Sequence, residues 1–128
     1  MELSNRKGKE IISEELREFI RREITNYIKE SSPGTYAGLN RYYIVIFRKS
    51  FVDILIEEPG KCYQILAKFF NNYDSAEFFI HCILERLLAS NPFYVAPAII
   101  ALKEGNDDEF KRILIHALSR ERKRKTMI

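Results

Sequence analysis

The chain has 128 residues, of which 46% are hydrophobic and 30% charged, and its formal net charge is +3. This combination predicts one globular domain that buries a core without disulfides or a structural metal, and the isolated Cys62 and Cys82 exclude a disulfide-rich secreted scaffold. Since the N-terminus lacks an apolar stretch and the longest apolar run, residues 93–102, is too short to cross a bilayer, we expect a cytoplasmic protein with no secretory signal and no membrane span.

Apolar residues at intervals of three and four predict a first amphipathic helix that begins at Glu10 or Ser13 and ends at Glu30. Ser13 is the expected N-cap, and the two glutamates that follow it suit the positive end of the helix dipole. The Ser-Ser-Pro-Gly sequence at residues 31–34 should end the helix.

Residues 42–56 fit either a buried strand or a helix, because the run from Tyr42 to Phe47 is β-branched and aromatic. On a helical wheel the apolar positions gather into a stripe of about 120°, and we find no turn signal within the segment. A lone strand would leave its backbone donors and acceptors unpaired, since no other segment offers a second strand. We therefore predict one long, largely buried helix over residues 42–56.

Two further helices have clear start signals. Pro59 suits a first helical position, and the helix that it begins should end at Asn71 and Asn72. Asp74 and Glu77 form a capping box ahead of the next helix, which extends to about residue 88. This helix is apolar around most of its circumference, so we expect it to run through the middle of the core.

The last two helices are separated by a glycine. Residues 91–105 form a fifth helix in which Pro97 either kinks the helix or delays its start, because the ring removes a backbone donor. Asn106 with Glu109 caps a sixth helix, whose apolar stripe ends at Leu118. About six helices joined by short loops predict an all-α fold, a single compact bundle with irregular crossing angles.

A basic tail at residues 119–128 should follow the helical domain at residues 10–118, which a flexible N-terminal segment at residues 1–9 should precede. The tail carries five cations and one anion, a balance of +4 against +3 for the whole chain, so everything before it sums to −1. Charge concentrated in this way is typical of a protein that binds a polyanion. The alternative is solvated disorder, since the basic run has no apolar stripe of its own. The cations of the tail are Arg120, Arg122, Lys123, Arg124 and Lys125.

A second candidate phosphate-binding segment interleaves cations with aromatic residues, as in proteins that stack bases and hold phosphates together. Its residues are Arg41, Tyr42, Arg48 and Lys49. Tyr42 can instead cover the start of a helix, which is the structural alternative to base stacking.

Motifs for catalysis or metal binding are absent from the sequence. It has no nucleotide-binding glycine motif, and its five glycines leave little material for a phosphate-cradling loop. A zinc ion needs four ligands, and the adjacent His81 and Cys82 would point about 100° apart on a helix. A Cys–His nucleophile pair would draw on the same residues without an orienting motif. We therefore expect no enzyme, no cofactor and no metal.

These features predict a small helical nucleic-acid-binding protein, or an accessory subunit of a nucleoprotein complex, that contacts the phosphates of DNA or RNA non-specifically. The alternative is a helical protein–protein interaction module, an adaptor or a homodimer, in which the basic tail only improves solubility. The candidate aromatic residues for such an interaction surface are Tyr36, Tyr73, Phe93 and Tyr94.

Overall fold

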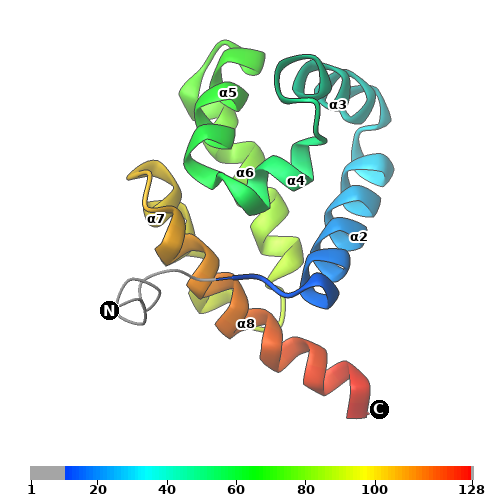
Figure 1. Ribbon diagram of the computed structural model, residues 1–128, viewed down its shortest axis with the longest axis vertical. Coiled ribbons are helices and arrows are strands. Elements are labelled where there is room, and N and C mark those ends of the chain that lie inside the picture. Colours follow the sequence, from blue (N-terminus) through cyan, green and yellow to red (C-terminus); the bar gives the residue numbers. More distant parts are fainter. Residues whose placement is uncertain (1–10, 128) are drawn as a thin grey trace, which may run out of the picture.

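The computed structural model describes the backbone of residues 11–127 and the side chains of residues 11–119 (Figure 1). Regular structure in this part of the chain is entirely helical, which confirms the predicted all-α class. The α-helices are α2 (Glu14–Ser31), α3 (Pro33–Phe47), α4 (Phe51–Glu57), α5 (Pro59–Phe70), α6 (Tyr73–Leu87), α7 (Val95–Lys103) and α8 (Asp107–Met127), and a 3₁₀-helix, η1 (Pro92–Tyr94), precedes α7. The N-terminal segment predicted at residues 1–9 lies outside the described residues.

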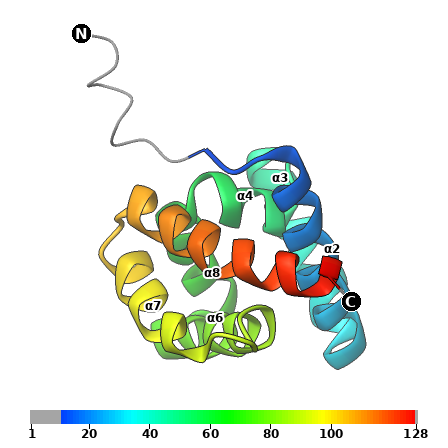
Figure 2. The ribbon, with the colours of Figure 1, turned by 90° about the horizontal axis from the view of Figure 1, so that it is seen from below.

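The helices cross at varied angles around α6 (Figures 1 and 2). On its flanks α6 contacts α2, α5 and α7, and α4 contacts both α2 and α5. Its buried residues are Ala76, Ile80, Ile83, Leu84 and Leu87. α6 therefore packs into the core through one side. Its apolar residues do not all face the core, however, because Phe78 is 68% exposed.

The N-terminus of α2 follows the sequence prediction. Ser13 caps the helix, because its Oγ accepts a hydrogen bond of 3.2 Å from the backbone N–H of Leu16. The helix ends at Ser31, as predicted, but Pro33 begins α3 directly afterwards. Because the fixed φ of proline suits a first helical position, residues 31–34 both end one helix and start the next.

The prediction of a single helix over residues 42–56 is wrong, because the chain turns between α3 and α4. Arg48 takes a left-handed conformation, with φ of 64°, directly after the last residue of α3. Ser50 then caps α4 by accepting a 3.2 Å hydrogen bond from Asp53 N–H, and Asn40 accepts another, of 3.3 Å, from Phe51 N–H. These side chains satisfy the first backbone donors of α4, so the break requires neither proline nor glycine.

The starts of α5 and α6 show one correct and one incorrect prediction. Pro59 is the first residue of α5, and Asn71 in the left-handed region ends the helix, as predicted. Asn72 is the N-cap of α6, because its Oδ1 accepts a 2.9 Å hydrogen bond from Ser75 N–H. The predicted capping box is wrong for this reason, and Asp74 lies inside the first turn instead.

The two alternatives left open for Pro97 are now decided. The proline is the third residue of α7, where a backbone N–H would have no partner within the α-helix. α7 therefore starts late, at Val95, so that Pro97 lies in its first turn. The three residues before Val95 form the 3₁₀-helix η1. Asn106 caps α8 as predicted, since its Oδ1 accepts a 3.3 Å hydrogen bond from Glu109 N–H.

The N-terminus of α5 packs tightly on the turn between α7 and α8. The backbone N–H of Gly60 donates to Asp107 Oδ1 at 2.9 Å, and a Cβ at Gly60 would lie 3.1 Å from Gly105 Cα. Such a Cβ would push two backbones apart, so the glycine permits a close contact between segments distant in sequence.

We expect Gly60→Ala to lower the free energy of unfolding by about 1 kcal/mol, because overpacking outweighs the better helix propensity of alanine. Gly34→Ala is the matched control. Gly34 also follows a proline at the start of a helix, but a Cβ there would meet nothing within 4 Å. Urea denaturation of both variants in dilute solution measures the difference, and an equal effect of the two substitutions would contradict the steric explanation.

Candidate functional site

The last helix extends well beyond the part whose side chains are described as core residues. Up to residue 119, the buried residues of α8 are Phe110, Ile113, Leu114, Ala117 and Leu118. They pack against α7 and α5. The sequence predicted that this helix would end at Leu118, but α8 continues to Met127. We call residues 119–127 the basic extension; it protrudes beyond the other helices at one end of the molecule (Figure 1).

The charge pattern of α8 matches the direction of the helix dipole. Asp107, Asp108 and Glu109 occupy its first turn, and the cations of the predicted tail occupy its last two turns. Acids near the N-terminus and cations near the C-terminus both interact favourably with the helix dipole. Repulsion between neighbouring cations opposes this stabilisation. The backbone of the basic extension is helical, and the side chains of its five cations lie outside the described residues.

The second predicted segment does not form a base-stacking platform. The ring of Tyr42 is half-buried against Phe69, with centroids 5.3 Å apart, and it also meets Tyr43 edge-on. Tyr42 therefore covers the core beside α5, which was the alternative interpretation. Lys49 Nζ lies 2.6 Å from Glu57 Oε1, so its charge is compensated within the fold.

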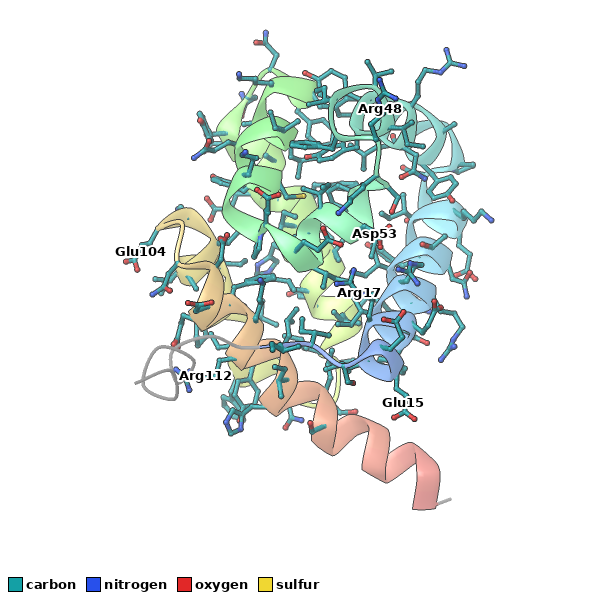
Figure 3. All side chains as sticks on the ribbon, in the orientation of Figure 1. Glu15, Arg17, Arg48, Asp53, Glu104 and Arg112 are labelled. Carbon is teal, nitrogen blue, oxygen red and sulfur yellow. The ribbon has the colours of Figure 1, made fainter. Side chains whose placement is uncertain are left out.

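The remaining cations of that segment, Arg41 and Arg48, are exposed, and no ion pair within residues 11–119 involves either of them. Arg48 lies at the upper end of the molecule in Figure 3, and the basic extension leaves at the lower end (Figures 1 and 3). The structure therefore does not bring the two predicted basic segments together into one site.

An ionic network that the sequence did not reveal joins α2 to α4 (Figure 3). Arg21 Nη2 lies 2.8 Å from Asp53 Oδ1, and Arg17 Nη1 lies 3.1 Å from Glu57 Oε2. The pKa of Glu57 lies below its ordinary value, mainly because Lys49 donates a hydrogen bond to its carboxylate. The pKa of Arg21 is raised, mainly by its hydrogen bond to Asp53. Because both arginines face carboxylates of the same domain, the network fastens helices together rather than presenting cations to a ligand.

The four aromatic residues predicted for an interaction surface lie on different elements. Phe93 of η1 is 89% exposed and Tyr73 of α6 is also exposed, whereas Tyr36 and Tyr94 are half-buried. The ring of Tyr73 packs on Tyr63, with centroids 5.6 Å apart, and Lys29 lies over the ring of Tyr36. These contacts give two of the four rings an intramolecular role.

A further apolar surface lies on α3, where the sequence indicated a buried helix. Ile44, Val45 and Ile46 are exposed. A hollow of 250 Å³ beside them is lined by Gly38, Arg41, Tyr42, Val45 and Ile46. These five residues recur at intervals of three and four, which was the available sequence signal for a second apolar face on this helix.

The ends of α2 and α5 and the first half of α6 enclose a pocket of 530 Å³. Phe70, Phe78 and Phe79 form its apolar walls, and the half-buried Cys82 lies at its edge. His81 pairs with Glu85, with its Nε2 2.9 Å from Glu85 Oε2. Residues 11–119 contain no group of three or more metal-ligating side chains.

No protein-family model matches the sequence, and no curated protein or solved structure is significantly similar to the chain. Within the described part of the chain, no helix combines the length and the hydrophobicity that crossing a membrane requires. We therefore infer function from the charges and surfaces of the chain itself.

Proposed function

We propose that the protein, alone or as an accessory subunit of a nucleoprotein complex, binds DNA or RNA through phosphate contacts of the basic extension. The supporting observation is that α8 continues as a helix beyond Leu118, the last buried residue among the side chains described up to residue 119. The basic extension carries five Lys and Arg with one Glu, whereas residues 11–118 carry thirteen Lys and Arg against fifteen Asp and Glu, a balance of −2. Positive charge is thus concentrated on a helical segment that follows the last described core residue of the chain.

The distribution of the cations along the helix favours backbone contacts over base readout. At 1.5 Å rise per residue, the basic extension spans about 13 Å, so several of its cations can reach consecutive phosphates. By helical register, Arg120, Lys123 and Arg124 fall within about 100° of one another. Cations that neutralise phosphates release condensed counterions, and the affinity therefore depends steeply on salt and little on sequence.

Bound phosphates would also relieve the repulsion between the cations of the basic extension. Nucleic acid should therefore stabilise the helical conformation of this segment. Binding and helix stability are linked in this proposal because the same charges control both.

The deciding experiment measures affinity for single- and double-stranded probes at two or more salt concentrations. We expect deletion of residues 119–128 to remove most of the affinity and to bring the slope of log K against log [salt] close to zero, since each lost duplex phosphate contact removes about 0.9 from the slope. The deletion begins after Leu118, so the buried residues remain. Circular dichroism checks that the helical domain is folded.

A matched pair of charge variants separates the basic extension from net charge. Lys123→Gln/Lys125→Gln should make the negative slope for duplex DNA shallower by up to about 2. Lys61→Gln/Lys68→Gln removes the same charge from the exposed face of α5 and should leave the slope nearly unchanged. Equal effects of the two pairs, or no binding by the full chain at low salt, would overturn the proposal.

A second candidate function, the helical interaction module, is supported by a different observation. The exposed side chains of Ile44, Val45 and Ile46 place apolar atoms in solvent on one helix, which is typical of surfaces that bind another protein. Nucleic-acid binding would leave this surface uncovered, so the two functions are compatible within one chain.

A further inference from the structure

Helix α3 has two apolar faces, of which the fold buries only one. Leu39 and Tyr43 point into the core and are fully buried. A second, wider face starts beside Leu39 and runs round to the far side of the helix. It contains Gly34, Ala37, Gly38, Arg41, Tyr42, Val45 and Ile46, of which Tyr42 is half-buried and the others are exposed. A surface helix normally carries charged residues on its outer face, but Arg41 is the only charged residue of α3.

This outer face changes from small to large residues along the helix. Gly34, Ala37 and Gly38 form its N-terminal half, and Tyr42, Val45 and Ile46 form its C-terminal half. The hollow of 250 Å³ lies along the C-terminal half and is bounded by Gly38 at the junction. The two halves of the face therefore differ in the size of their side chains.

The fold itself does not require the glycines of this face. A Cβ at Gly34 would meet nothing within 4 Å, and one at Gly38 would meet only the Phe69 ring, at an ordinary distance of 3.8 Å. Neither glycine has a positive φ. Glycine is unfavourable inside a helix, so a residue that packing and backbone conformation do not require indicates a close contact from outside the domain.

We propose that the outer face of α3 binds the same face of a second copy of this chain, as an antiparallel helix pair related by a two-fold axis near Asn40. In this arrangement the large half of each helix covers the small half of the other. Tyr42 lies opposite Gly38, and Ile46 lies opposite Gly34. A parallel pair would oppose large to large and small to small, which leaves a gap at one end and a clash at the other.

The charges at the two ends of α3 complement the antiparallel pairing. Glu30 lies in the last turn of α2, just before α3, and Arg48 directly follows α3. Both are exposed, and neither takes part in an ion pair within residues 11–119. The two-fold axis brings the end that carries Arg48 to the α2–α3 junction of the other copy, which carries Glu30. Arg41 flanks the axis, where its long side chain can reach solvent at the rim.

The dimer is independent of the proposed phosphate binding. In Figure 1, α3 lies at the upper end of the molecule and the basic extension leaves at the lower end. The pairing therefore leaves both basic extensions free, and the oligomeric state can be measured without nucleic acid.

Sedimentation equilibrium of the full chain tests the proposal. The wild-type chain should be dimeric at about 50 µM, and Ile46→Glu should raise the dissociation constant about 100-fold, because it places a charge against an apolar contact. Ile100→Glu is the matched control, since Ile100 lies on α7 and is exposed to a similar degree, 55% against 45% for Ile46. It should leave the dissociation constant unchanged.

Gly38→Ala gives a second test, because it should weaken the dimer but stabilise the monomer. It should weaken the dimer about tenfold because the added Cβ separates the two helices, and in dilute solution it should raise the melting temperature of the monomer by about 3 °C. A wild-type chain that is monomeric at 50 µM would overturn the proposal. A dimer that Ile46→Glu and Gly38→Ala leave intact would overturn it as well.

Discussion

Replacement of Tyr43 with alanine is expected to lower the free energy of unfolding by about 3–5 kcal/mol, because it removes the largest fully buried side chain of the core. The ring of Tyr43 packs edge-on against Phe51 of α4, with centroids 5.3 Å apart, and is stacked on Phe47. Its hydroxyl donates a 2.6 Å hydrogen bond to the carbonyl oxygen of Cys62 in α5. One side chain thus connects α3, α4 and α5.

Two further substitutions separate the contributions of the ring and the hydroxyl. Tyr43→Phe keeps the aromatic contacts and should cost only about 1 kcal/mol, the value of one hydrogen bond. Burial raises the pKa of Tyr43, so the hydroxyl remains a donor throughout the usual pH range. Tyr73→Ala is the control at an exposed ring and should cost less than Tyr43→Ala. Urea denaturation measures all three, and equal losses at Tyr43 and Tyr73 would contradict the central role of Tyr43.

The sequence predicts those parts of the fold that local hydrogen bonds determine. Ser13 and Asn106 each bond a backbone N–H three residues ahead, and Pro59 restricts its own φ. Such signals are contained in four or five consecutive residues. This is why the starts of α2, α5 and α8 can be recognised without the structure.

The break between α3 and α4 was missed because part of its cause is not local. Asn40, eleven residues earlier, bonds the start of α4 together with Ser50, and Arg48 takes its left-handed conformation without a glycine to mark it. The start of α3 was also missed. Gly34 and Gly38 locally disfavour a helix, but the burial of residues farther along α3 outweighs that preference.

The candidate site shows the same division between local and tertiary information. The concentration of cations after Leu118 is visible in the sequence, because it depends only on composition. The pairing of Lys49 with Glu57, and of Arg17 with the same carboxylate 40 residues away, depends on the packing of α2 against α4. Sequence alone could not distinguish a cation that is compensated inside the fold from one that is free to bind phosphate.

The second substitution with a large expected effect on stability is at Glu57, and its effect depends on pH. Glu57→Gln is expected to lower the free energy of unfolding by about 1–2 kcal/mol near neutral pH, since glutamine cannot carry the charge that Lys49 and Arg17 contact. The pKa of Glu57 in the folded protein lies below its ordinary value of 4.5, mainly because of the hydrogen bond from Lys49. The carboxylate therefore stabilises the fold above about pH 4.5, and its contribution is lost as the pH falls through the lowered pKa.

The difference between wild type and Glu57→Gln should accordingly be constant between pH 6 and 8 and shrink toward zero in acid, where the wild-type carboxyl is also neutral. Denaturation of both proteins by urea at a series of pH values measures it. Glu104→Gln is the control, because Glu104 is exposed at the end of α7 and its replacement should change stability by less than about 0.5 kcal/mol at every pH. A difference at Glu57 that persists unchanged to pH 3 would mean that side-chain shape, rather than charge, stabilises the contact between α2 and α4.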